Sequence, residues 1–159
     1  MLPKTLPGLS AELYQIGVVV ADIDQGMRDY SELLGIGPFW RLDTDYTARY
    51  RGWTGRAANR NAFARWDSLY LEMIAPGQGD TNAREWLRMR GPGIFHLGFA
   101  TDDITQRPMG AEVVFESLDS QGRPAVVHLD TVAQLGYYVE LAPRAMVEKL
   151  CARIDAEVG

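Results

Sequence analysis

Several features that would narrow the class of this protein are missing from its sequence. It has one cysteine, Cys151, which excludes an internal disulfide and leaves too few thiols for a cysteine-based zinc site. The run of about 18 apolar residues that a membrane-spanning helix needs does not occur. The opening residues MLPKTLPGLS also lack the basic region and apolar run of a signal peptide. We therefore expect a cytoplasmic protein with no membrane partner, in which any metal ligands are nitrogen and oxygen atoms.

Positive charge is scarce over the whole chain, with one exception. The formal net charge of −5 argues against a nucleic-acid partner, because such binding needs a basic surface. Within residues 41–65, however, six arginines stand against two aspartates. We interpret RGWTGRAANRN (51–61) as a loop, which in most proteins would be a solvated connection; the alternative is that it closes over an anionic small molecule. The substrate-binding candidates here are Arg51, Trp53, Arg56 and Arg60.

Size and composition are those of an ordinary globular protein. The 159 residues are 47% hydrophobic and 23% charged, which disfavours disorder. A chain of this length can bury a sizeable core in one unit. We expect residues 1–159 to form a single domain.

An internal repeat is the most informative feature of the chain. YQIGVVVADI at 14–23 is echoed by FHLGFATDDI at 95–104, which is 81 positions later. YLEMIAP at 70–76 is echoed by YVELAPR at 138–144, which is 68 positions later. The second repeat is therefore 81 − 68 = 13 residues shorter than the first.

The first repeat predicts a βαβββ module over about residues 13–76. After the opening strand, Asp22 or Asp24 can cap a one-sided helix that ends at Gly35, a favoured helix C-cap. A bridging helix is expected at about 82–90, where Asn82 and Glu85 stand at capping-box spacing. The predicted strands of this module are 13–20, 39–50, 61–66 and 68–74.

The second repeat predicts the same module with a shortened helix, over about residues 94–143. Only TQRPMG separates its first two strands, which leaves scarcely any room for a helix. A C-terminal amphipathic helix is expected at about 144–158. The predicted fold class is α+β, with two paired βαβββ modules that form a curled sheet around a concave cleft. The strands of this second module are expected at 94–101, 111–117, 126–130 and 137–142.

In the opening strand of each repeat, a polar residue shares a face with glycine. Side chains alternate along a strand, so Gln15 lies on the face of Gly17, and His96 lies on the face of Gly98. A polar group beside missing side chains makes a poor core surface. The same arrangement makes a suitable floor for a ligand cleft.

Two carboxylates stand at matching points of the closing strands. Glu72 follows Tyr70 by two residues and Glu140 follows Tyr138 by two, so each acid shares a face with a tyrosine. Buried carboxylates need a partner, and a cation would supply one. We interpret the two tyrosines as substrate-contacting walls of the cleft.

These motifs resemble the vicinal oxygen chelate superfamily. That family includes glyoxalase I, methylmalonyl-CoA epimerase, extradiol dioxygenases, fosfomycin-resistance transferases and bleomycin-resistance proteins. The resemblance covers about residues 13–143 and is strongest to methylmalonyl-CoA epimerase and glyoxalase-like proteins. It implies a sheet curled into a cup, with one metal ligand from the first and last strand of each module. The segments that carry it are YQIGVVVADIDQGMRDYSELLGIGPF, LYLEMIAP, RGPGIFHLGFATDDI and YYVELAP.

The resemblance also implies a chemistry. Carried over by position, the metal ligands would be Gln15, Glu72, His96 and Glu140, which suit a divalent Mn, Co, Ni, Zn or Fe ion. The expected activity is that of a metal-dependent isomerase, epimerase or lyase, which acts on a small oxygenated, anionic substrate through a metal-stabilised enolate. Glu72 or Glu140 would serve as the base, and His128 is a secondary candidate for proton transfer.

Gln15 departs from the family pattern, in which many members have histidine on the first strand. A neutral amide is a weaker ligand, and this counts against an extradiol dioxygenase, whose iron is held by two histidines and one carboxylate. The competing hypothesis is a metal-free small-molecule binding protein of the bleomycin-resistance kind. The resemblance further implies a homodimer, for which exposed edge strands would give a physical route. Whether one chain or two complete the site stays open.

Overall fold

The computed structural model describes residues 6–159 as a mixed α+β fold built on one sheet of nine strands. Its elements are, in chain order, β1 (Ala11–Val19), α1 (Ile23–Leu34), β2 (Trp40–Arg41), β3 (Thr44–Tyr50), β4 (Trp53–Trp66), β5 (Leu69–Pro76), α2 (Asn82–Arg90), β6 (Gly93–Thr101), the 3₁₀ helix η1 (Pro108–Gly110), β7 (Val113–Leu118), β8 (Pro124–Leu129), α3 (Val132–Leu135), β9 (Tyr138–Pro143) and α4 (Arg144–Val158).

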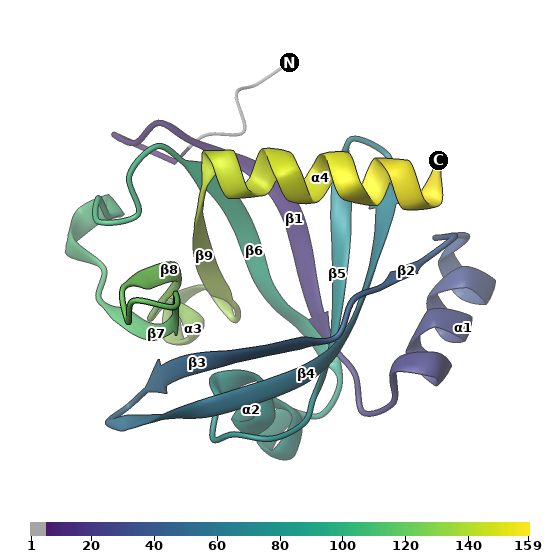
Figure 1. Cartoon of the computed structure of the whole chain (residues 1–159), viewed down its shortest axis with the longest axis horizontal. Helices are drawn as coiled ribbons and strands as arrows, with labels where there is room; N and C mark the ends of the chain where they lie inside the picture. The colour runs from purple at the N-terminus through teal and green to yellow at the C-terminus, as the bar shows by residue number, and fades with distance from the viewer. Residues whose placement is uncertain (1–5) are drawn as a thin grey trace.

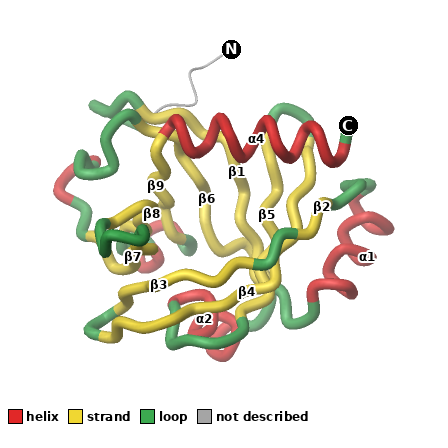
Figure 2. The backbone as a smooth tube through the Cα atoms, in the orientation of Figure 1, coloured by secondary structure: helices red, strands yellow, loops and turns green. Residues whose placement is uncertain are grey.

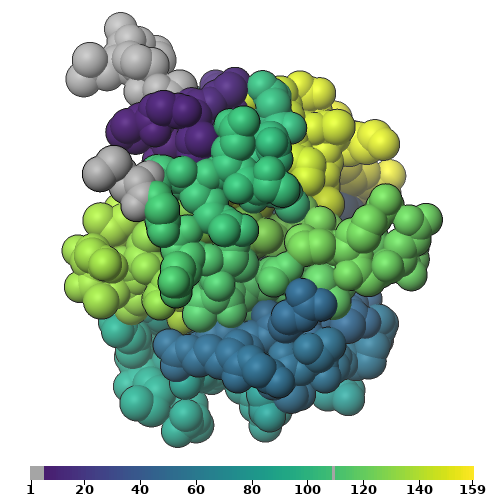
Figure 3. Space-filling model, turned by 90° about the vertical axis from the view of Figure 1, so that its left-hand side faces the viewer, coloured from purple at the N-terminus to yellow at the C-terminus, as the bar shows by residue number. Residues whose placement is uncertain are grey.

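The curled sheet closes on itself. Its order is β2-β4-β3-β7-β8-β9-β6-β1-β5, and a further pairing of β4 with β5 completes a ring (Figure 1). Two seams join the halves of the chain, the pairing of β3 with β7 and that of β1 with β6. In Figure 3 the strands of the first half, in blue, lie directly against the green segments of the second half. Among the described strands, β2 alone has a single partner strand.

Strand pairing follows the same plan in both halves. The opening strand pairs in parallel with the closing strand, β1 with β5 and β6 with β9. The closing strand also pairs antiparallel with the strand before it, β4 or β8. In the connection after β6, where the first half has the 12-residue helix α1, the second half has only the three residues of η1.

Helix α1 has the caps that its sequence predicts. The Asp22 side chain accepts a hydrogen bond from the backbone N–H of Gln25, and Gly35 adopts the left-handed conformation at the C-cap, with φ of 68°. The buried residues Ile23 and Gly26 face the sheet, where Met73 of β5 packs against them. The helix therefore begins after the predicted cap Asp22 and ends at the predicted cap Gly35.

Three expectations about the first half are wrong. The stretch 51–61 is not a loop, because β4 begins at Trp53 and runs to Trp66. Helix α2 is capped by Thr81, whose hydroxyl accepts from the backbone N–H of Arg84, and not by Asn82. The predicted strand 39–50 is also interrupted, since β2 and β3 are separate strands.

Helix α4 runs across β9, β6, β1 and β5, whereas α1 and α2 lie outside the strands (Figure 2). Near its start, Arg144 Nε donates to Asp102 Oδ1 at 2.8 Å. Near its end, Asp155 accepts hydrogen bonds from the Tyr70 hydroxyl at 3.0 Å and from Arg65 at 3.1 Å. The helix is thus held at both ends. None of the described helices is long and apolar enough to cross a lipid bilayer.

Candidate metal centre

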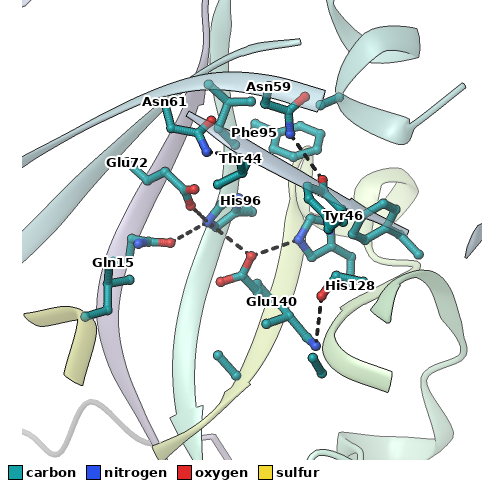
Figure 4. A pocket seen from close by; sticks show the side chains of 18 of the residues that line it. Gln15, Thr44, Tyr46, Asn59, Asn61, Glu72, Phe95, His96, His128 and Glu140 are labelled. Carbon is teal, nitrogen blue, oxygen red and sulfur yellow. Dashed lines mark hydrogen bonds and ion pairs between the residues drawn. The ribbon is translucent and has the colours of Figure 1, made fainter. Parts of the chain in front are cut away.

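Four side chains from adjacent strands converge on one point inside the ring (Figure 4). The nitrogen His96 Nε2 lies 2.8 Å from Gln15 Oε1, 3.6 Å from Glu72 Oε2 and 3.6 Å from Glu140 Oε2. These residues stand on β6, β1, β5 and β9, which neighbour one another in the sheet. The structure therefore brings together, within a single chain, all four positions at which the sequence predicts metal ligands.

The opening strands make room for each other's polar side chains. In the pairing of β1 with β6, Gln15 lies opposite Gly98 and Gly17 lies opposite His96. A Cβ atom on Gly17 would lie 2.2 Å from His96 Cε1, and one on Gly98 would lie 3.1 Å from Gln15 Cβ. Each glycine thus leaves the space that the polar side chain of the other strand occupies.

Glu140 is held by a chain of hydrogen bonds. The Tyr14 hydroxyl donates to Glu140 Oε1 at 3.2 Å, and His128 Nε2 lies 2.9 Å from Glu140 Oε2. At the other ring nitrogen, Asn82 Nδ2 lies 2.9 Å from His128 Nδ1. Because Nδ1 accepts from the amide, the imidazole proton sits on Nε2 and points at the carboxylate. Here His128 acts as a donor to Glu140, and the fully buried Asn82 fixes its tautomer.

Burial controls the charges of this group. It lowers the pKa of His96 to about 4, so the imidazole is neutral. Burial, followed by repulsion from Glu140, raises the pKa of Glu72 well above its ordinary value. Burial also acts to raise the pKa of Glu140, but the neighbouring imidazoles of His96 and His128 outweigh it and bring this pKa below its ordinary value. Two carboxyl groups are thus held together with no strong positive charge beside them.

The arrangement fits a divalent cation. Ligand atoms that share one ion at about 2.1 Å lie roughly 3 to 3.5 Å apart, which is close to the separations around His96 Nε2. His96 Nδ1 is buried and has no hydrogen-bond partner among the described residues, so it is available to carry the proton when Nε2 coordinates. An overlapping group of His96, His128 and Glu140 has donor atoms within 4.8 Å of one another. The set of Gln15, Glu72, His96 and Glu140 fits better, because His128 Nε2 donates its hydrogen bond to Glu140 and so has no lone pair for a metal ion.

The site opens into a cavity of about 390 Å³. Its walls are largely apolar, with Phe63, Phe95 and Phe115 among them, and α4 contributes Met146 and Val147. The polar part of the opposite wall comes from β3 and β4, namely Thr44, Tyr46, Asn59 and Asn61 (Figure 4). Among the described residues, no arginine or lysine lines this cavity.

Comparison with known proteins identifies the family. A family model described as the Glyoxalase/Bleomycin resistance protein/Dioxygenase superfamily matches residues 14–110. The chain belongs to this superfamily. No curated protein matches its sequence significantly.

Solved structures similar to this superfamily member include methylmalonyl-CoA epimerases. The enzyme from Mycobacterium tuberculosis has a TM-score of 0.59 and 21% identity, over 90% of this chain and 93% of that chain. A Streptomyces coelicolor epimerase variant in complex with 2-nitronate-propionyl-CoA has a TM-score of 0.54 and 22% identity, over 84% and 96%. A hypothetical protein from Bacillus halodurans C-125 has a TM-score of 0.58 and 19% identity, over 84% and 94%. At these identities the likeness shows the fold.

The four substrate-binding candidates in the arginine-rich stretch of this superfamily member do not line the cavity. Arg51 and Trp53 border a second cavity of about 400 Å³, which is also lined by residues of α2 such as Arg84 and Arg88. Arg56 is exposed on β4 and forms an ion pair with Asp45. Arg60 is exposed on the same strand. The clustered positive charge therefore lies outside the site that the four converging side chains define.

The two tyrosines of the closing strands are also absent from the lining of the cavity. Tyr70 lies under α4, where its hydroxyl donates to Asp155. Tyr138 is buried in a cluster with Trp86 and Phe95. The alternation of side chains predicts that each tyrosine shares a face with the glutamate two residues later. It does not predict how far the cavity extends along that face.

Sequence reasoning missed the asparagines of the site. Asn59 and Asn61 fell in the stretch interpreted as a loop, although the alternation of buried and less buried residues from Ala57 to Asn61 is that of a strand. Asn82 was interpreted as a helix cap. In both cases polar residues misled the prediction, because asparagine commonly indicates a loop or a helix cap.

Proposed function

We propose that the protein is a metal-dependent enzyme of the isomerase or epimerase type, which moves a proton on a carbon atom next to a carbonyl group. The observation that carries this proposal is the convergence of Gln15, Glu72 and Glu140 on His96 Nε2. An amide, an imidazole and two carboxylates form a donor set suited to a divalent ion of intermediate hardness. We propose these four residues as the metal ligands.

Charge balance supports a cation at this point. Glu72 and Glu140 lie within a largely buried site, and the imidazole of His96 between them is neutral. Buried carboxylates that lack a counter-charge are costly, and a divalent ion would neutralise both. Without a cation, the raised pKa of Glu72 favours its protonated form, whereas a divalent ion would let both carboxylates stay ionised as ligands.

Glu72 is our candidate for the base. Glu140 is fixed by hydrogen bonds with Tyr14 and His128, whereas the contact that holds Glu72 is the longer one to His96, at 3.6 Å. Glu72 is also the more exposed carboxylate, with 17% of its side chain accessible against 9% for Glu140. A less constrained carboxylate can more easily approach a substrate proton.

The proposed reaction begins when a Glu72 oxygen accepts a proton from the carbon next to the carbonyl. The C–H bond breaks, its electron pair moves toward the carbonyl oxygen, and an O–H bond forms on Glu72. Return of the proton from Glu72 to a neighbouring atom gives an isomer. Transfer of a proton from a water molecule to the other face of the carbon gives an epimer, and Glu72 then passes its proton to the hydroxide that is left. A divalent ion bound here would supply the positive charge that stabilises the charge developing on oxygen.

His128 and Asn82 act in this proposal as positioning residues. His128 donates a hydrogen bond to Glu140, and Asn82 holds the ring in the tautomer that can donate. Partners of this kind orient ligands and tune their basicity, and their loss commonly lowers metal affinity by about 10-fold to 100-fold.

The test is a metal titration followed by proton exchange. Mn²⁺, Co²⁺, Ni²⁺ or Zn²⁺ should raise the melting temperature of the chelator-treated protein, and His96→Ala should abolish that response. Glu148→Gln, a change of an exposed carboxylate on α4, is the matched control for Glu72→Gln. In D₂O, the loaded wild type should exchange the proton next to the carbonyl in members of a panel of small ketones and thioesters, and Glu72→Gln should not. A protein that neither binds these ions nor catalyses exchange would favour the metal-free binding alternative.

A further inference from the structure

We infer that the wall of the cavity opposite the metal centre selects an uncharged substrate with a ring-like apolar body and hydrogen-bond donors, which Asn59 and Asn61 recognise. This inference rests on the proposed function in so far as the cavity is a substrate site. It replaces the anionic substrate that the arginine-rich stretch suggests.

The two asparagines present unpaired acceptors inside the cavity. Asn59 is 9% exposed and Asn61 is 3% exposed, and both line the cavity. The Oδ1 atom of each is buried without a hydrogen-bond partner among the described residues. Buried carbonyl oxygens of this kind are rarely left unpaired in folded proteins. Two such atoms on one cavity wall point to a ligand that supplies the donors.

Neighbouring hydroxyl groups bind the nitrogen end of both amides. Asn59 Nδ2 donates to the Tyr46 hydroxyl at 3.1 Å, and Asn61 Nδ2 donates to Thr44 Oγ1 at 3.0 Å. Both partners stand on β3, which pairs with β4 along this wall. Each amide therefore uses its nitrogen within the protein and leaves its oxygen for a ligand.

The spacing of the acceptors limits the geometry of the substrate. Asn59 and Asn61 are two residues apart on one strand, so their side chains leave the same face about 7 Å apart. Two donors at opposite ends of a six-membered ring or a similar body match that separation. The apolar body would lie against Phe63, Phe95 and Phe115.

The charge of the cavity disfavours an anion. Among the described residues its only acidic side chains are Glu72 and Glu140, and it has no arginine or lysine. A divalent ion balances the two carboxylates and leaves no surplus positive charge on the walls. A substrate carboxylate placed against the wall of Asn59 and Asn61 would face two amide oxygens and no positive charge, which is costly.

Three para-substituted benzenes test the inference. 1,4-Benzenedimethanol is neutral and has two donors, its bis(methyl ether) keeps the shape but has no donor, and terephthalate is a dianion. We expect the diol to bind the Zn²⁺-treated protein about 10-fold more tightly than either analogue, which is the value of about one buried hydrogen bond. Asn59→Leu and Asn61→Leu should each reduce the preference for the diol over the ether. Arg56→Gln, an exposed change on the same strand, should leave it unaltered.

The outcomes separate this inference from the proposed function. Tighter binding of terephthalate, equal binding of the ether, or no binding of the diol in the millimolar range overturns the inference. The comparison of probes needs only the wild type, so a variant that fails to fold does not remove the test. The same measurements are repeated on the chelator-treated protein, which tests the asparagine wall without the metal. The preference for the diol should persist in that protein, even if the metal titration contradicts the proposed function.

Discussion

At the residue scale, the position of His96 depends on the missing side chain of Gly17. We predict that Gly17→Ala displaces the imidazole, because the new Cβ would lie 2.2 Å from His96 Cε1. Zinc affinity, measured by calorimetry, should fall about 10-fold or more. Gly93→Ala is the matched control, since a Cβ there meets nothing within 4 Å. An unchanged affinity in Gly17→Ala would mean that the ring can shift without cost to the site.

Asn82 makes a second test at this scale. Asn82→Ala removes the donor to His128 Nδ1 and leaves that nitrogen buried, so we expect a loss of about 1–3 kcal/mol in the free energy of unfolding. Zinc affinity should fall as well, because Glu140 loses its orientation. Urea denaturation and calorimetry measure the two effects. Thr81→Ala, which removes the cap of the same helix, should lower stability by about 1 kcal/mol and leave zinc affinity unchanged.

Cys151 provides a prediction about pH. Burial raises the pKa of its thiol to about 11. Because the thiolate is the reactive form, alkylation by iodoacetamide at pH 8 should be much slower than for a free thiol of ordinary pKa. The rate, followed by mass spectrometry of the intact protein, should keep rising as the pH passes 9 and approaches 11. A plateau near pH 9 would show that the thiol is not shifted.

The sequence predicted some residues of the site and missed others. Gln15, Glu72, His96 and Glu140 could be selected because the repeat marks equivalent points of two strand pairs, and the family resemblance implies metal ligands at these points. The cavity asparagines had no such counterpart. Their role follows from which atoms remain unpaired after folding, and that cannot be derived from residue types alone.

At the element scale, β4 shows where pattern reading fails. Glycine, asparagine and arginine are uncommon in strands, so the stretch from Trp53 to Asn61 resembled a loop. In the structure its alternate residues face the interior, where Ala57, Asn59 and Asn61 are buried. Inward polar residues are tolerated because this part of the interior is a cavity with hydroxyl partners. The helices α1 and α4 were easier to predict, because their interior faces are apolar.

Helix α4 gives the prediction for this scale. Ile154 is fully buried, and we expect Ile154→Ala to lower the free energy of unfolding by about 2–5 kcal/mol through the cavity it creates. Leu33→Ala is the control, because Leu33 is 81% exposed on α1 and its truncation should change stability by less than about 0.5 kcal/mol. Chemical denaturation compares the two. Similar values would mean that α4 is not firmly docked against the strands.

At the scale of the whole molecule, the candidate metal centre joins the two halves of the chain. Gln15 and Glu72 belong to the first half, and His96 and Glu140 belong to the second. A saturating divalent ion, at about 1,000 times its dissociation constant, should add about 4 kcal/mol to the free energy of unfolding. Near-ultraviolet and far-ultraviolet circular dichroism should follow one transition that moves as a unit when the ion is added. Separate transitions for the halves would contradict the role of the closed ring.

Because the sheet closes within one chain, the proposed activity should not depend on the protein concentration. All four converging side chains and the described cavity walls come from the same polypeptide, so the proposed active site does not require a second copy even if copies associate as the family resemblance implies. Turnover per chain should hold steady on serial dilution, far below the concentration at which any dimer would come apart.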